Sequence, residues 1–124
     1  MATESNDQTV LNSDALGQIR EINPEMGDVL VNQILQTYLD SSADLVKKIE
    51  AAINDEDAKS LQIAAHSLKS ASASIGADSL SALCKVLEMS GNSGDLSQVR
   101  AVQNDANQHY QQVIAEIKKR LNQE

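Results

Sequence analysis

The sequence predicts an all-α protein: an antiparallel up-down-up-down four-helix bundle with a short extra N-terminal helix capping one end. Hydrophobic residues recur at spacings of three and four along four long segments, and no segment alternates with the period of two typical of a β-strand. The hydrophobic fraction of 41% consists mostly of Ala, Leu, Ile and Val, with two Tyr and neither Phe nor Trp. Such a composition favours helices over sheets.

The amino-terminal part of the chain differs from the rest. Residues 1–11 are polar and without periodicity, which predicts a disordered arm. We expect residues 12–124 to form a single helical domain, because 124 residues leave no room for two full cores. Capping side chains at Asn12–Asp14 predict a short helix over about residues 13–20. Pro24 then interrupts the chain, since the residue before a proline avoids the helical region.

Two long helices are predicted in the middle of the chain. The first begins at Pro24 or Asp28 and extends to about Asn54. An acidic turn at residues 55–57 favours the start of the second, over about residues 57–75, because carboxylates stabilise the N-terminus of a helix. The hydrophobic stripes of the two helices are Val31, Ile34, Leu35, Tyr38, Leu45, Ile49, Ala52 and Ile53, and then Leu61, Ala64, Ala65, Leu68, Ala71 and Ile75.

Two further helices complete the predicted bundle. Gly76 is expected to end the preceding helix in a left-handed conformation, and Asp78 to cap the next helix, over about residues 78–90. A loop at residues 91–94 precedes the last helix, over about residues 96–121. The hydrophobic stripes are Leu80, Leu83, Cys84 and Leu87, and then Val99, Val102, Ala106, Tyr110, Val113, Ile117 and Leu121.

The charge of the chain limits its partners. Ten basic residues against eighteen acidic ones give a net charge of −8, which argues against nucleic acid or an anionic membrane, because both bind basic surfaces. The charge is uneven: residues 1–28 carry a net −5, whereas residues 58–87 carry +2. There is no signal peptide and no apolar run long enough to span a membrane, so we expect a cytoplasmic protein without membrane insertion. One Cys excludes an internal disulfide, and one Cys with two His cannot build a Cys-rich zinc site.

His66 points away from the hydrophobic stripe of its helix, about 160° from Leu68 on a helical wheel. Lys69 lies one turn further on the same face, and Ser70 and Ala73 beside the imidazole are small. An exposed imidazole is largely neutral at pH 7 and therefore a competent nitrogen nucleophile, while a lysine beside it would attract an incoming phosphoryl oxygen. The pattern suits a phosphoryl acceptor, and it also suits a solvent-facing histidine on an ordinary helix. A metal site is disfavoured, because no second His or carboxylate follows four residues later.

The residues around His66 resemble the H-x-L-K…G-A signature of histidine-containing phosphotransfer (HPt) domains. The chain reads His66-Ser67-Leu68-Lys69, then Gly76-Ala77, within the run AAHSLKSASASIGADSLSALCKVLE. The resemblance covers about residues 13–121. One position departs from the family: Ser70 stands where a Gly usually follows the signature Lys, which bears on how closely a partner backbone can approach.

The resemblance implies a role for individual residues. His66 matches the histidine that is phosphorylated at Nε2, Lys69 the residue near the phosphoryl group, and Gly76 the glycine that ends the active-site helix. Glu88 falls where family members often carry a Gln or Glu that accepts a hydrogen bond from Nδ1–H of the histidine; it also suits a solvated surface acid. The expected docking face for a partner comprises Gln62, Ser70, Ala73, Gly76, Lys59 and Lys85. The last two also suit ordinary solvated charges.

The implied function is that of a phosphorelay intermediate in bacterial-type two-component signal transduction. His66 would accept a phosphoryl group from a receiver-domain aspartate and pass it to the aspartate of another receiver. The expected partners are response-regulator receiver domains or a hybrid sensor kinase, with this chain a monomer. We expect no cofactor here, because Mg²⁺ would belong to the receiver. The chain has no P-loop or nucleotide-binding glycine motif, so we expect a carrier without ATP binding or autokinase activity, either free-standing or the terminal module of a hybrid kinase.

Two functions of other classes compete with this interpretation. A non-catalytic helical interaction or adaptor module would leave His66 incidental, although it would not need a polar, uncluttered face around it. A dimerising kinase bundle would need a catalytic domain of its own, for which the length leaves no room. His109 is interpreted as a surface residue and Cys84 as a packing residue.

Overall fold

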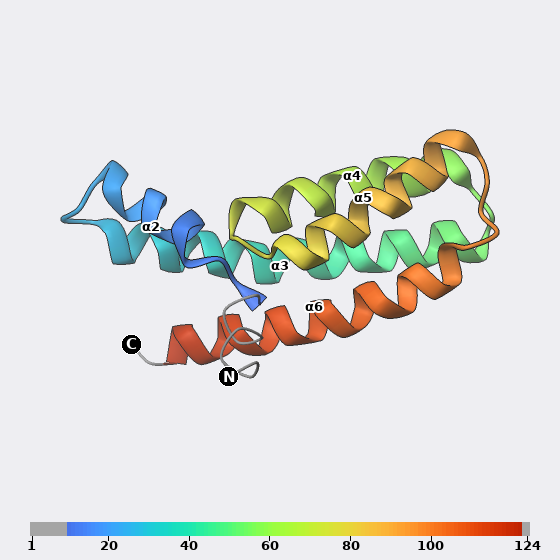
Figure 1. The fold of residues 1–124 in the computed structure, drawn as a ribbon. Coiled ribbons are helices and arrows are strands. Elements are labelled where there is room, and N and C mark those ends of the chain that lie inside the picture. Colours follow the sequence, from blue (N-terminus) through green and yellow to red (C-terminus); the bar gives the residue numbers. More distant parts are fainter. Residues whose placement is uncertain (1–9, 123–124) are drawn as a thin grey trace, which may run out of the picture.

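Five α-helices make up most of the part of the chain that the computed structural model describes, residues 10–122. Figure 1 shows α3, α4, α5 and α6 lying side by side, with α2 beside the first part of α3. No strand occurs within these residues, so the predicted all-α class is confirmed. The bounds are α2 Ser13–Ile22, α3 Gly27–Asn54, α4 Ala58–Ser74, α5 Asp78–Ser93 and α6 Val99–Asn122.

The start of the packed chain lies earlier than predicted. Of the predicted arm, residues 1–9 lie outside the described residues, whereas Leu11 is in the core with 3% of its surface exposed. The side chain of Asn12 caps α2 by accepting a hydrogen bond from the backbone N–H of Asp14. The backbone N–H of Asn12 donates to the carbonyl of Gly76 at 2.7 Å. This segment therefore packs against the turn between α4 and α5, far away in sequence.

The predicted stripes meet in one hydrophobic core. α4 packs against α3 and α5, and α6 packs against α5 and α3. Leu35, Leu61, Ala65, Cys84 and Ile117 are 0% exposed. Fully burying a Leu or Ile side chain contributes about 1.5–3 kcal/mol, so these contacts between helices stabilise the fold and hold α4 in one orientation.

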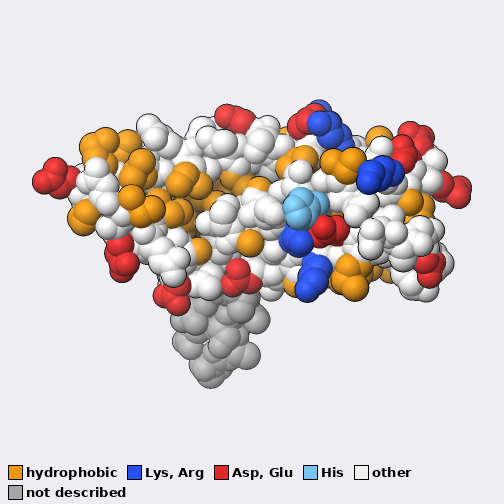
Figure 2. Space-filling view, turned by 90° about the horizontal axis from the view of Figure 1, so that it is seen from above, with side chains coloured by type: hydrophobic (Ala, Val, Ile, Leu, Met, Phe, Trp, Pro, Cys, Tyr) orange, Lys and Arg blue, Asp and Glu red, His pale blue; other side chains and the backbone are white. Residues whose placement is uncertain are grey.

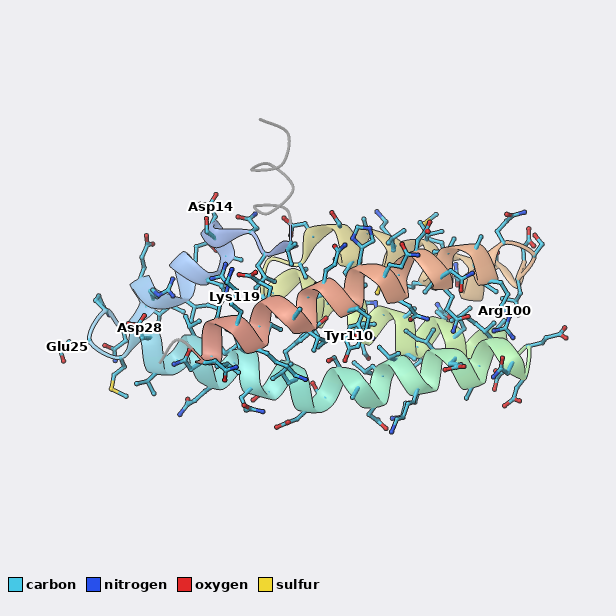
Figure 3. All side chains as sticks on the ribbon, turned by 90° about the horizontal axis from the view of Figure 1, so that it is seen from below. Asp14, Glu25, Asp28, Arg100, Tyr110 and Lys119 are labelled. Carbon is cyan, nitrogen blue, oxygen red and sulfur yellow. The ribbon has the colours of Figure 1, made fainter. Side chains whose placement is uncertain are left out.

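The core also contains polar residues that a search for hydrophobic periodicity passes over. Ser42 and Ser72 are 0% exposed. Each shares a hydrogen bond of 2.8 Å with a tyrosine: Ser72 with Tyr38, and Ser42 with Tyr110. These pairs connect α3 with α4 and α3 with α6, and Figure 3 shows Tyr110 on the side of α6 that faces α3. Buried hydroxyls need such partners, because an unpaired polar group in a core is costly.

The ends of α5 differ from the prediction. The helix continues to Ser93 through the residues expected to form a loop, and Gly94, with φ +83°, ends it. Asp78 is the first residue of α5 and not its cap, since the N-cap residue is Ala77, which has no side-chain cap bond. The Asp78 carboxylate instead accepts a hydrogen bond from Nδ2 of Asn12 at 3.1 Å. Gly91, expected in the loop, lies buried within the helix.

Candidate functional site

The packing of α4 presents His66 to solvent. Ala64, Ala65 and Leu68 on the opposite face are buried, with 4%, 0% and 2% of their surfaces exposed. Because residues two positions apart lie on nearly opposite faces of a helix, burying these residues turns the imidazole outward. The side chain of His66 is 59% exposed, as the helical wheel predicts.

The structure brings three of the predicted site residues together. Glu88 on α5 lies between the other two, with Oε2 2.8 Å from Nδ1 of His66 and Oε1 2.7 Å from Nζ of Lys69. His66 and Lys69 are on α4, so the cluster joins the two helices. Figure 2 shows this face of the molecule, with a histidine next to a basic and an acidic side chain. One carboxylate thus uses its two oxygens for two different partners.

The charges in the cluster determine the protonation of the carboxylate. The ammonium of Lys69 is the largest cause that holds the pKa of Glu88 below its ordinary value; partial burial opposes it, and the hydrogen bond with His66 adds to it. Glu88 is therefore a carboxylate at neutral pH and can only accept hydrogen bonds. In a neutral imidazole, Nδ1 must then carry the proton that it donates to Glu88, which leaves the lone pair on Nε2.

The remaining predicted docking residues separate into two groups. Lys59, Ser70, Ala73 and Lys85 are exposed. Gln62 is partly buried, and its Nε2 donates to Oδ1 of Asn92 on α5 at 3.2 Å. Gly76 is predicted on this face, but the structure buries it.

The burial of Gly76 follows from its backbone. It has φ +82°, the left-handed conformation that the sequence predicts, and a Cβ built on it would lie 2.5 Å from the carbonyl oxygen of Asn12. Gly76 therefore serves the α4–α5 turn and its contact with the segment before α2. It is not available to an incoming partner.

Exposed hydrophobic side chains occur on both helices of the site, and the sequence pattern did not single them out. Ile63 on α4 is 56% exposed, and Val86 and Met89 on α5 are 43% and 60% exposed. In Figure 2, hydrophobic side chains lie on the same face as the histidine. The sequence contained one signal for them: these hydrophobic residues lie outside the hydrophobic stripes of their amphipathic helices. Of the three, Ile63 lies one helical turn before His66 on α4 and is therefore a neighbour of the imidazole.

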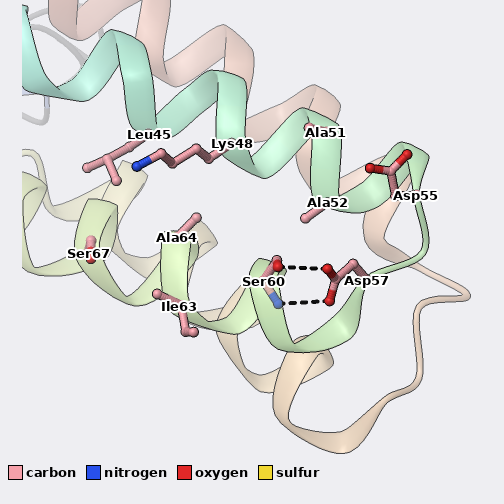
Figure 4. Close-up of a pocket in the computed structure, with 10 residues that line it drawn as sticks. All are labelled: Leu45, Lys48, Ala51, Ala52, Asp55, Asp57, Ser60, Ile63, Ala64 and Ser67. Atoms are coloured by element: carbon pink, nitrogen blue, oxygen red, sulfur yellow. Dashed lines mark hydrogen bonds between the residues drawn. The ribbon is translucent and has the colours of Figure 1, made fainter.

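A groove of about 360 Å³ lies next to the site, between α3 and α4. It extends from the acidic turn at Asp55 to Ser67, and Figure 4 shows the Asp57 side chain capping α4 through two hydrogen bonds to Ser60. His66 is not among the residues that line it. With 59% of its side chain exposed, the imidazole lies on an open surface, which a large partner can reach more readily than it can reach a closed pocket.

The other residues considered from the sequence lie apart from this cluster. His109 is partly buried on α6. Cys84 is buried in the core, where desolvation raises the pKa of its thiol to about 12. Within residues 10–122, no three His, Cys, Asp or Glu side chains are placed to hold a metal ion. None of the described helices is both long and apolar enough to cross a membrane.

Comparison with known proteins agrees with these observations. A family model described as the Hpt domain matches residues 33–123. The fold is also similar to the crystal structure of histidine-containing phosphotransfer protein B (HptB) from Pseudomonas aeruginosa, with a TM-score of 0.82 and 25% sequence identity. The match covers 92% of this chain and 96% of that one. A search of curated proteins finds no match.

Proposed function

The chain belongs to the Hpt domain family, and from this premise we propose that His66 is the residue through which it acts. Members of the family are phosphotransfer carriers and not kinases, and this chain is a histidine phosphorelay intermediate of two-component signalling. The observation that carries the proposal is the 2.8 Å contact between Nδ1 of His66 and the Glu88 carboxylate, on an imidazole that is 59% exposed. This contact frees Nε2 for chemistry and leaves it open to a partner.

The transfer step uses the tautomer that Glu88 selects. The Nε2 lone pair attacks the phosphorus of an aspartyl phosphate on a receiver domain; the Nε2–P bond forms as the bond between phosphorus and the aspartate oxygen breaks. The receiver carboxylate leaves with the electron pair, and the ring becomes a phosphorylated imidazolium that keeps its proton on Nδ1. Glu88 stabilises the positive charge that develops on the ring, because its carboxylate already accepts the Nδ1–H bond. Attack by the aspartate of a second receiver reverses these changes.

Lys69 has two functions in this proposal. Its ammonium bonds Oε1 of Glu88 at 2.7 Å, and so orients the carboxylate whose other oxygen faces His66. It also places a positive charge one helical turn from the imidazole, which favours the approach of the anionic phosphoryl group. The sequence predicts only the second function.

The surroundings of His66 suit a receiver domain as partner. Exposed Lys59 and Lys85 give the face a positive charge within an acidic chain, and the phosphorylation pocket of a receiver is acidic. Exposed Ile63, one helical turn before His66, supplies apolar contact area that loses water on docking. We expect Mg²⁺ to be held by the receiver, since His66, Lys69 and Glu88 offer only one oxygen-bearing side chain to such an ion.

The arrangement of the helices supports a rigid platform for this exchange. We infer that α3–α6 form an antiparallel up-down-up-down bundle, with α2 covering one end, and that the chain acts as a monomer in the cytoplasm without binding ATP. Figure 3 shows Glu25 and Asp28 where α2 leads into α3, and Arg100 at the other end of the molecule.

Phosphotransfer from a labelled receiver tests the proposal. The receiver is phosphorylated with a small phosphodonor and mixed with the wild-type chain, with His66→Gln, or with His109→Gln as the matched control. We expect acid-labile, base-stable label on the wild type and the control, and loss of essentially all label on His66→Gln with unchanged thermal stability, because the side chain is exposed. Equal labelling of the two variants would instead assign transfer to another residue.

A further inference from the structure

α5 approaches α4 so closely at Gly91 that the contact has no room for a side chain. A Cβ built on Gly91 would lie 2.6 Å from the backbone nitrogen of Gln62 and 2.7 Å from the backbone oxygen of Ala58. Both atoms belong to the backbone of α4, so no side-chain rotation could relieve the overlap. We propose that Gly91 is a positioning residue for His66: it sets the spacing between α4 and α5 at which Glu88 reaches the imidazole.

The position of Gly91 within α5 supports this role. Glycine is normally unfavourable inside a helix, and the glycine that ends α5 is Gly94, with φ +83°. Gly91 lies before that end and is buried. Its place in the stripe of Leu80, Cys84 and Leu87 points it at α4, where the close approach of the two backbones explains why no larger residue is present.

The contact at Gly91 is next to the site along both helices. Gln62 precedes His66 by four residues, and Gly91 follows Glu88 by three, so the contact is about one helical turn away on each side. Because α4 and α5 run in opposite directions here, these two turns face one another. A change in spacing at Gly91 therefore reaches the pair of Glu88 and His66 directly.

The hydrogen bond at the site tolerates little movement. The distance from Nδ1 of His66 to Oε2 of Glu88 is 2.8 Å, and a separation beyond about 3.5 Å is no longer a hydrogen bond. On the other side of the site, Oγ of Ser81 on α5 donates to the carbonyl of Lys69 at 2.9 Å. A methyl group at position 91 would thus tilt α5 away from α4 about this second contact, and Glu88 would move with it. The proton of the imidazole would then lose the acceptor that keeps it on Nδ1.

The test compares Gly91→Ala with two controls by NMR of ¹⁵N-labelled histidine. Gly17→Ala is the matched glycine control, because a Cβ there meets nothing within 4 Å. Asn92→Ala removes the neighbouring bond to Gln62 but leaves Gly91 in place. We expect His66 to lose its preference for the Nδ1–H tautomer in Gly91→Ala alone. The NMR spectra need no partner protein, so the tautomer can be measured even if the proposed phosphotransfer function is wrong. Only the expected effect on phosphotransfer rests on the proposed function.

Measuring the rate of phosphotransfer tests whether Gly91 acts through Glu88. We expect Gly91→Ala to slow transfer by about threefold to tenfold, the range expected for losing one hydrogen bond. In a chain that already carries Glu88→Ala, the same substitution should cause no further slowing, because interacting sites are not additive. An unchanged tautomer, additive effects, or a Gly91→Ala chain that does not fold even at low temperature would overturn the proposal. The last outcome would give Gly91 a role in the whole fold and not in the site.

Discussion

The interior of the bundle and the face that carries His66 both use polar side chains to connect helices, at nearly the same distances. Inside, Tyr38 pairs with Ser72 and Ser42 with Tyr110 at 2.8 Å. On the surface, Glu88 contacts its two partners at 2.7 and 2.8 Å. The interior pairs are neutral hydroxyls, whereas the surface cluster is charged. Burial decides this difference, because an ion in a core must lose its water, and a hydroxyl needs only one partner.

Reactivity in this chain depends on exposure more than on residue type. Cys84 has the most nucleophilic kind of side chain in the sequence, yet it lies in the core. His66 has an ordinary imidazole on an open face. Measurements of modification, stability and phosphotransfer can test this difference between the buried and the exposed side chains.

Burial should strongly slow the chemical modification of Cys84. Burial raises the pKa of its thiol from 9.0 to about 12, so at pH 8 the thiolate is about a thousandfold scarcer than in an ordinary cysteine. We expect a thiol reagent to modify the native chain on the order of a thousand times more slowly than the chain unfolded in urea. Rapid reaction of the native protein would show that the interior opens easily, and would weaken the contrast.

A smaller effect is expected when a buried hydroxyl pair is broken. Ser72→Ala leaves the hydroxyl of Tyr38 without its partner in the core, where burial already raises the pKa of the tyrosine. We expect a loss of about 1–3 kcal/mol in the free energy of unfolding, measured with urea. Phosphotransfer measured well below the unfolding midpoint should not change. A stable variant with impaired transfer would link the interior pair to the site.

The smallest effect on stability is expected at the surface cluster. Lys69→Ala removes the ammonium of a side chain that is 28% exposed and takes its ion-pair partner from Glu88, so we expect the free energy of unfolding to fall by no more than about 1 kcal/mol. Phosphotransfer should slow by about tenfold, since both the charge near the phosphoryl group and the orientation of Glu88 are lost. Lys85→Ala, which changes an exposed lysine on the neighbouring helix, is the control and should have a weaker effect on transfer.

The pH dependence of Glu88 gives a second measurement on the same variant. A carboxylate whose pKa is lowered by folding contributes stability above its ordinary pKa of 4.5, and loses it as the pH falls through the lowered value. Since Lys69 is the largest cause of the lowering, Lys69→Ala should move the midpoint of Glu88 to higher pH. ¹³C NMR of the carboxyl group measures this midpoint. An unmoved midpoint would mean that Lys69 and Glu88 do not interact in solution.

The local features of the fold were predictable because the periodicity of a helix can be recognised in a short stretch of sequence. The spacing of hydrophobic residues located α3, α4 and α6 to within a few residues and turned His66 toward solvent. The left-handed conformation of Gly76 was likewise predictable from a glycine at the end of a helix. The end of α5 was not predictable, because residues 91–94 contain two glycines, as a loop would. Only the close contact of Gly91 with α4 explains why a glycine stands inside this helix.

Most of the helical residues, the faces that the helices bury and the exposed position of His66 could be predicted from the amino-acid sequence. The sequence also showed the family, through the residues that follow His66. The packing of the helices against one another was needed to show that one carboxylate contacts both His66 and Lys69, and that Gly76 packs against Asn12. The reason is physical: the face of a helix follows from its own residues, whereas the distance between two helices depends on every side chain packed between them.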